Sequence, residues 1–211
     1  MARSTTSGVC CEKVRPENAA RLFPNPASIL FSSTVVKLLS TKRRIMEVGG
    51  GCLRNAAYLL GMGHSVTVLE VPRIKERFPD QYEKFVKQGG VFVERWPKRC
   101  AFDMVVVTFV VETICNPSAR SALLRGVNEH LTSDGVLVLS ARGPKDLLTA
   151  QNRGVRCGDG YLTPNFSFAR SYTRVQMERL LKNMGFKTHF LHKDSTKEPE
   201  YLHVVARKTD E

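Results

Sequence analysis

The stretch RRIMEVGGGCLRNAAYLLGMGHSVTVLE, from Arg43 to Glu70, decides the fold. The short apolar run RRIMEV ends at three consecutive glycines, and good helix formers then follow over residues 54–63, with a stop at Gly63. The β-branched run HSVTVLE comes next and predicts a second strand, which ends in Glu70. A glycine-rich turn between a strand and a helix is the context in which such turns bind nucleotide cofactors. Glycine suits this turn because the backbone must bend tightly and let a ligand approach without a Cβ.

The rest of the chain continues the alternation of helices and strands. We expect helices over 27–40, 80–90, 118–131 and 172–185, the last capped by Thr173. We expect strands over 64–70, 91–96, 102–114, 134–142, 186–192 and 200–208. This order predicts an α/β protein, a three-layer sandwich over a mostly parallel sheet. The segment 143–172 has little periodicity, and loops of this length in folded domains are usually binding loops or lids.

The composition is that of an ordinary globular protein. The 211 residues are 42% hydrophobic and 25% charged, which predicts one domain with a substantial core. No apolar run approaches the roughly 20 residues that span a bilayer, and the first residues lack the apolar centre of a signal peptide. We therefore expect no membrane association and a soluble, cytoplasmic protein. Residues 1–26 are polar and hold three prolines, which predicts a loose arm or short helix before a domain over 27–211.

The cysteines and histidines do not suggest a metal centre. The six cysteines contain no C-x-x-C pair; they are Cys10, Cys11, Cys52, Cys100, Cys115 and Cys157. We expect Cys10 and Cys11 to be free thiols in a mobile N-terminus, and Cys115 to be a packing residue. His189 and His192 lie on a predicted strand at a spacing that sends them to opposite faces, so they are poor joint ligands. His64 and His130 are predicted to be structural.

The charge balance favours anionic partners. The formal net charge is +12, from 32 Lys and Arg against 20 Asp and Glu. This excess suits nucleic acid, phosphorylated metabolites or an acidic surface. The basic residues are scattered, however, and no basic motif interleaved with aromatic residues is present. Nucleic acid therefore stays an open alternative that rests on net charge alone.

The residues around the glycines distinguish between cofactors. A dinucleotide fingerprint reads G-x-G-x-x-G, but Gly49-x-Gly51 is followed by Arg54 at the third position. Glu47 ends the first strand, where an acid suits a cationic ligand better than a diphosphate. Glu70 lies 19 residues beyond Gly51, where a carboxylate can bind both hydroxyls of a ribose.

The segment EVGGGCLRNAAYL, residues 47–59, resembles the first motif of class I S-adenosylmethionine-dependent methyltransferases, E/D-x-G-x-G-x-G. Its continuation RNAAYL is similar to small-molecule members such as the tellurite-resistance methyltransferases. The resemblance covers about residues 43–207 and implies a mostly parallel, seven-stranded Rossmann-like sheet with an antiparallel last strand. It also implies S-adenosyl-L-methionine as cofactor.

The resemblance implies cofactor-binding roles for particular residues. Those expected to contact the cofactor are Glu47, Gly49, Gly50, Gly51, Glu70, Glu94, Trp96 and Thr108. Among them Glu47, Gly49 and Gly51 would hold the methionine moiety, and Glu70 the ribose. The turn from Glu94 to Trp96 would border the adenine, on which Trp96 either stacks or, as a lone tryptophan, serves only in packing. One departure from the motif is Leu53, which stands where its last glycine usually does.

The sequence argues against DNA bases as the methyl acceptor. Neither the D/N/S-P-P-Y/F tetrapeptide nor the Pro-Cys nucleophile of DNA base methyltransferases is present. The expected reaction is therefore methyl transfer to an oxygen or nitrogen of a small or anionic acceptor. If a general base is needed, the candidates are Glu112, Asp159 and Tyr161, the last two in the 143–172 segment. That segment is either a substrate lid or a plain surface excursion.

Three other functions stay open at this point. An RNA methyltransferase would account for the basic balance and would bind RNA with a steep salt dependence. A cofactor-sensing or partner-binding protein without turnover would account for Leu53. A nicotinamide-dependent oxidoreductase should bind NADH, against which Arg54 argues. Neither the acceptor nor the oligomeric state follows from the sequence.

Overall fold

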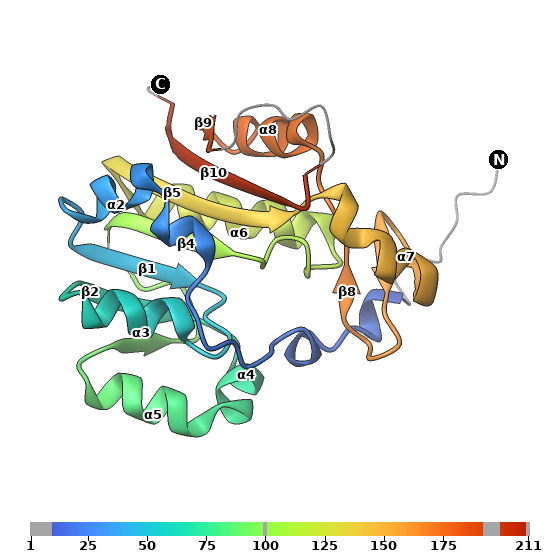
Figure 1. The fold of residues 1–211 in the computed structure, drawn as a ribbon, viewed down its shortest axis with the longest axis horizontal. Helices are drawn as coiled ribbons and strands as arrows, with labels where there is room; N and C mark the ends of the chain where they lie inside the picture. The colour runs from blue at the N-terminus through green and yellow to red at the C-terminus, as the bar shows by residue number, and fades with distance from the viewer. Residues whose placement is uncertain (1–9, 99–100, 192–198, 210–211) are drawn as a thin grey trace.

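Seven strands form the central sheet of a computed structural model, which describes residues 10–98, 101–191 and 199–209 (Figure 1). The strands are β1 (Arg44–Val48), β2 (Ser65–Leu69), β3 (Val91–Val93), β4 (Phe102–Thr108), β5 (Leu131–Arg142), β9 (Phe186–Phe190) and β10 (Tyr201–Lys208). Their order is β3-β2-β1-β4-β5-β10-β9. The pairs among β1 to β5 are parallel, and β10 runs antiparallel to both β5 and β9. The predicted sheet, with its antiparallel last strand, is therefore confirmed.

Helices cover both faces of this sheet. They are α2 (Ser33–Leu39), α3 (Arg54–Gly61), α4 (Pro72–Arg77), α5 (Pro79–Lys87), α6 (Pro117–His130) and α8 (Arg174–Lys182), with short 3-10 turns η1 (Pro16–Asn18) and η2 (Ser28–Phe31). Consecutive strand residues point to opposite faces. Ile45 packs in the core beneath α2, α3 and α5, whereas Met46 packs in the core beneath α6 and α8. Both faces of β1 and β4 are thus buried, as their apolar runs predict.

Local signals explain several element boundaries. Thr173 and Gln176 form a reciprocal capping box at the start of α8, as the predicted Thr173 cap requires. Asn116 caps α6 through the backbone amides of Ser118 and Ala119. The strand expected over 102–114 ends at Thr108, because Phe109 has a left-handed φ of 58° that an extended strand does not allow. The chain after Phe109 turns away as a loop and carries Glu112 beside the sheet.

The segment 143–172 differs from the irregular stretch expected. It contains the turn η3 (Pro144–Leu147), the helix α7 (Leu148–Arg153) and a small antiparallel sheet. The sheet consists of β6 (Val155–Cys157), β7 (Gly160–Leu162) and β8 (Phe168–Ala169). Its strands are only two or three residues long, too short for a period-2 pattern to be recognised in the sequence.

The N-terminal arm is also different from the prediction. Cys10 and Cys11 are not free thiols, and Cys115 does more than pack. Disulfides join Cys10 to Cys157 and Cys11 to Cys115. The described arm (blue in Figure 1) extends from β8 past α4 before it reaches α2. The sequence could not predict these pairs because their partners lie 147 and 104 residues apart.

Hydrogen bonds fasten the arm further. The Arg15 amide donates to the Phe166 carbonyl at 2.8 Å. Asn18 and Asn165 exchange side chain–to–backbone bonds, with N···O distances of 2.6 and 3.2 Å. At the other end of the arm, the Arg77 guanidinium donates to the Glu17 carbonyl. The expected loose arm is thus a strap that connects the small sheet to α4.

Two sequence predictions fall outside this description in part. His192 and Cys100 lie outside the described residues, so the histidine-pair argument has only its first member, His189, on β9. Among the described helices, none is long and apolar enough to cross a membrane.

Removing the two cross-links should destabilise the fold. We expect the double variant Cys10→Ser/Cys11→Ser to lose at least about 2–4 kcal/mol of the free energy of unfolding, because each disulfide restricts the unfolded chain. Denaturant titration without reductant measures this loss. Cys52→Ser, which removes a thiol outside the disulfides, is the matched control and should stay within about 0.5 kcal/mol of the unmodified protein. Equal stability of the double variant and the unmodified protein would contradict the cross-links.

Candidate functional site

The residues singled out in the opening stretch meet at the carboxyl ends of β1, β2 and β4. The register pairs Glu47 of β1 with Val68 of β2 and with Val106 of β4. The loop after β1 continues the ladder, since the Gly49 amide donates to the Leu69 carbonyl at 2.9 Å. Ligands of open α/β sheets bind at this edge. The candidate site is therefore in the place where the sequence predicted it.

Each glycine of the loop is required by its surroundings. Gly49 has a φ of +75°, and a Cβ there would lie 2.3 Å from Cγ2 of Val110. Gly51 has a φ of +54° with open space around it, and a Cβ on Gly50 would lie 2.6 Å from Cγ1 of Val68. The loop thus combines left-handed backbone with close packing underneath, and it leaves the side above Gly51 free for a ligand.

Leu53 has a left-handed backbone, the conformation that glycine adopts most easily. Its φ of 65° and ψ of 19° are left-handed, a conformation that costs a non-glycine residue about 1–2 kcal/mol. Its side chain is 1% exposed and belongs to the core beneath α3. A side chain buried in this way does not line the open side of the loop. The left-handed backbone of Leu53 is strained, and the burial of its side chain in the core offsets this strain. The side chain does not enter the space above Gly51.

Glu47 lies in a buried polar network under the loop. Its Oε1 accepts from the Asn55 amide at 2.8 Å, and the same amide nitrogen donates to Oγ1 of Thr108 at 2.9 Å. The Asn55 carbonyl oxygen accepts from the Ala27 amide at 2.7 Å, which ties the end of the arm to the network. Among the described residues, none donates a hydrogen bond to Glu47 Oε2, although this oxygen is buried. An unpaired buried carboxylate oxygen is costly and marks a place for a donor or a cation.

The burial of Glu47 changes its titration. Loss of water around the carboxylate raises its pKa from 4.5 to about 8, although the hydrogen bond from Asn55 lowers it in part. The backbone of Ala56 also lowers this pKa, whereas the charge of Glu70 after β2 raises it and the charge of Arg54 at the start of α3 lowers it. A carboxyl group with such a pKa becomes ionised when a cation binds beside it.

Glu70 closes the site from β2. Its Oε2 accepts from the Gly51 amide at 3.0 Å, and its Oε1 accepts from the Val71 amide at 2.8 Å. Burial raises its pKa, and these two amide bonds lower it in part. The carboxylate is thereby fixed against the glycine loop, and each oxygen retains a lone pair for a further donor.

Of the two residues expected beside the adenine, Glu94 is exposed in the turn after β3. Trp96 stacks on His130 with the ring centroids 4.7 Å apart, and its ring would meet a Cβ placed on Gly126 of α6. The packing role for Trp96 is thus visible in the structure, while the contact of either residue with adenine stays a prediction.

Glu112 lies in the loop after β4, toward the small sheet. Its side chain is 0% exposed, and neither carboxylate oxygen has a hydrogen-bond partner among the described residues. Arg142 Nε is 3.9 Å from Oε1 and is the nearest charge partner. Burial raises the pKa of Glu112 to about 7, and Arg142 lowers it in part. A group with this pKa can accept or release a proton near neutral pH.

Asp159 is held by two arginines. Its Oδ2 pairs with Arg120 Nη2 at 2.5 Å and also with Arg170 Nη1. Arg120 is 2% exposed, and among the described residues no acceptor reaches its Nη1. Two positively charged guanidinium groups thus share one negatively charged carboxylate, so this ion-pair cluster has a net positive charge.

Tyr161 and His130 have local hydrogen-bond partners, whereas His64 is a buried histidine of the core. The Tyr161 hydroxyl accepts from Arg156 of the same small sheet at 3.2 Å. His130 contacts the carbonyl oxygens of Gly126 and Pro97, in agreement with a structural role. His64 is buried, and burial lowers its pKa, so it is a neutral packing residue near neutral pH.

The sequence did not identify three residues of this region. Asn55, which joins Glu47 to Thr108, stands in the quoted helix, and a polar residue on its buried face was the available signal. Arg120 and Arg142 gave no such signal, because a single arginine in an amphipathic helix or at a strand end is usually exposed.

Comparison with known proteins supports the fold. No family model matches the sequence, and no curated protein matches it. Among solved structures, the CcbJ methyltransferase from Streptomyces caelestis is 14% identical with a TM-score of 0.66, over 88% of this chain and 91% of that one. A Clostridium acetobutylicum ATCC 824 S-adenosylmethionine-dependent methyltransferase is 13% identical with a TM-score of 0.64, over 87% and 90%.

A third structure was solved with ligands. It is the Burkholderia thailandensis 1,6-didemethyltoxoflavin-N1-methyltransferase, with bound 1,6-didemethyltoxoflavin and S-adenosylhomocysteine. It is 20% identical with a TM-score of 0.56, over 87% of this chain and 79% of that one. The chain thus has the fold of class I S-adenosylmethionine-dependent methyltransferases, as its glycine motif indicated.

The raised pKa of Glu47 makes a prediction about stability. The folded state holds the Glu47 proton up to about pH 8, whereas an unfolded carboxyl releases it near 4.5. The free energy of unfolding should therefore fall as the pH rises through this window, by up to about 1.4 kcal/mol per pH unit from this group.

Urea titrations of the unmodified protein and of Glu47→Gln between pH 5 and 8 measure this contribution. The variant should lose this part of the pH dependence, whereas Glu76→Gln, a change at an exposed glutamate of α4, should keep it. If the free energies of unfolding of the unmodified protein and of Glu47→Gln changed with pH in the same way, the prediction would be contradicted. The pKa of Glu47 would then be the same in the folded and the unfolded protein.

Proposed function

We propose that this chain is an S-adenosylmethionine-dependent methyltransferase. The observation that carries the proposal is the buried Glu47 carboxylate, whose Oε2 lacks a donor among the described residues beneath a glycine loop with open space above Gly51. Such a group suits a positively charged ligand and is poorly suited to a diphosphate. When bound, S-adenosylmethionine supplies a methyl group activated by a sulfonium. The fold shared with known methyltransferases supports the same assignment.

Different residues of the site would bind different parts of the cofactor. Glu47, Gly49 and Gly51 would hold the methionine moiety, with the Glu47 carboxylate beside its positive charge. Glu70, fixed by the Gly51 and Val71 amides, would accept hydrogen bonds from the ribose hydroxyls. Leu53 supports the loop from below, so its presence does not argue for a protein that has lost turnover.

We assign the acceptor side to the loop of Glu112 and the lid 143–172. Glu112 would accept a proton from the acceptor, because its pKa of about 7 populates the ionised form near neutral pH. Asp159 would instead hold Arg120 and Arg170 in place. The Arg170 amide donates to the Glu112 carbonyl at 3.1 Å, so the lid covers Glu112 and would have to move before an acceptor could reach it.

The acceptor that this arrangement suits is a small anion. Arg120 and Arg170 share one carboxylate, and this local positive excess would attract a negatively charged group. Named neighbours are a glycopeptide N-methyltransferase, a mitomycin 7-O-methyltransferase and the toxoflavin-precursor enzyme, which act on small molecules through nitrogen or oxygen. Only the net charge of the chain supports RNA as the acceptor.

Calorimetric titration with S-adenosylmethionine, its demethylated product and NADH in parallel tests the proposed cofactor. We expect micromolar binding of the first two and none of NADH. Binding of NADH alone would replace the proposal with an oxidoreductase. Binding of none of the three would remove the functional assignment and leave the fold.

Replacing Glu70 tests the ribose assignment. Glu70→Ala should weaken binding of S-adenosylhomocysteine by about 1–3 kcal/mol, because charge-assisted hydrogen bonds to the ribose are lost. Glu76→Ala, at an exposed position of α4, is the matched control and should bind as the unmodified protein does. Titration calorimetry of both folded variants measures the difference, and unchanged binding to Glu70→Ala would refute the ribose contact.

Replacing Glu112 tests the proton acceptor. With an acceptor found by screening small anionic phenols, amines and carboxylates for transfer of a labelled methyl group, Glu112→Gln should lower kcat by about 10²–10⁴. In the unmodified protein kcat should rise with pH through about 7, and the variant should lose this rise. Binding of S-adenosylhomocysteine should not change. A variant with unchanged kcat would exclude Glu112 as the base.

A further inference from the structure

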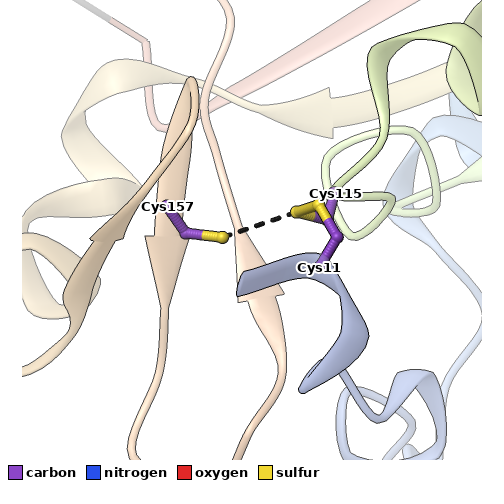
Figure 2. Close-up of side chains that lie close together, drawn as sticks. All are labelled: Cys11, Cys115 and Cys157. Carbon is purple, nitrogen blue, oxygen red and sulfur yellow. Dashed lines mark hydrogen bonds between the residues drawn. A yellow bond between two sulfur atoms is a disulfide. The ribbon is translucent and has the colours of Figure 1, made fainter. Parts of the chain in front are cut away.

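Four cysteines from three segments form one sulfur cluster. Cys10 and Cys11 come from the arm, Cys115 from the loop between β4 and α6, and Cys157 from β6. The Sγ atoms of Cys115 and Cys157 belong to different disulfides, yet they lie 3.5 Å apart. Figure 2 shows these two sulfurs facing one another, with Cys11 bonded to Cys115. Two disulfides are therefore in direct contact.

The two ends of each disulfide differ in exposure. Cys115 is 9% exposed and Cys157 is 2% exposed, whereas Cys10 and Cys11 are only half-buried. A thiolate from solution therefore reaches the arm sulfur of either disulfide first. The buried sulfur is then the leaving group, and the leaving thiolate is formed beside the second disulfide.

We propose that this cluster is a thiol–disulfide exchange site at which one equivalent of a dithiol breaks both disulfides of the arm. A thiolate of the dithiol attacks Sγ of Cys11, the Cys11–Cys115 bond breaks, and Cys115 leaves as a thiolate. The Cys115 thiolate attacks Sγ of Cys157, the Cys10–Cys157 bond breaks, and Cys10 leaves and takes up a proton. The second thiol of the reductant then releases Cys11 as a thiol and becomes part of a cyclic disulfide.

The exchange balances in atoms and electrons. Two protein disulfides and one dithiol become one protein disulfide, Cys115–Cys157, two thiols at Cys10 and Cys11, and one oxidised dithiol. Two electrons pass to the protein, and the two protons lost by the dithiol appear on the arm thiols. A first attack on Cys10 leads to the same product, because Cys157 then leaves and attacks Cys115.

Three physical features favour the second step. Its two sulfurs are already at 3.5 Å, so the reaction is intramolecular and has a high effective concentration. A thiolate at a buried position is poorly solvated, and the attack transfers the charge to the half-buried Cys10. The Cys10 sulfur that leaves is half-buried, so solvent can protonate it and remove the thiolate that would reverse the step.

The exchange would change the connection between three parts of the molecule. Cys115 lies three residues after Glu112, and Cys157 lies two residues before Asp159. In the oxidised protein the arm is bonded to both segments, and after exchange they are bonded only to each other. The inference concerns the sulfur chemistry and does not depend on methyl transfer.

Peptide mapping after limited reduction tests the proposal. In a Cys52→Ser/Cys100→Ser background, the oxidised protein is treated with one equivalent of dithiothreitol, quenched with acid and alkylated. We expect chains alkylated at both Cys10 and Cys11, with a Cys115–Cys157 disulfide, to exceed chains alkylated at Cys11 and Cys115 by at least about tenfold. The reverse ratio would overturn the proposal, because it would mean that each disulfide is reduced by itself.

The variant Cys157→Ser in the same background is the matched control. It lacks the sulfur that the Cys115 thiolate attacks, so Cys11 and Cys115 should be alkylated together. Alkylation of Cys115 in this variant shows that the reagent reaches the freed thiol, so its protection in the parent supports the bond to Cys157. A Cys115 that stays unalkylated in the variant would contradict the assignment, because protection in the parent would then reflect burial alone. Four free thiols with one bound zinc ion in the protein purified without reductant would also overturn it, since the cluster would then be a metal site.

Discussion

The burial of one carboxylate determines how this site is built. Glu47 is the penultimate residue of β1, and Asn55 binds it together with Thr108 and the Ala27 amide. These contacts join β1, β4, α3 and the end of the arm at a single point. The oxygen left over, Glu47 Oε2, lies beneath a loop whose glycines leave room for a ligand. The proposed cofactor chemistry depends on that oxygen.

The strong signals of the sequence were those set by local chemistry. The β-branched runs predicted the sheet, and the residue Thr173 predicted a helix cap; the structure contains both. The spacing from Gly51 to Glu70 placed these two residues together, and the Gly51 amide donates to the Glu70 carboxylate. In the sequence, Leu53 is a departure from the glycine motif. Its left-handed φ and its burial could not be known from the residue type, since both depend on the core beneath α3.

Much of what the sequence did not predict arises from contacts between distant segments. The disulfides of Cys10 and Cys11 and the ion pair of Asp159 with Arg120 join parts of the chain that no local pattern connects. The strands β6 to β8 are neighbours in the chain and were missed because each has only two or three residues. The disulfides fasten the arm to the 143–172 segment and to the loop after β4. The proposed acceptor side is thus built mainly from long-range contacts, and the proposed cofactor side mainly from one continuous stretch.

A crystal structure of the protein with S-adenosylhomocysteine tests the central claim most directly. The account predicts the homocysteine moiety against Gly49 and Gly51, with its amino group beside Glu47 Oε2, and the ribose hydroxyls on the Glu70 carboxylate. A ligand bound elsewhere, or one at this edge with Glu47 still buried away from it, would contradict the account. In that case the burial of Glu47 would serve only the stability of the fold.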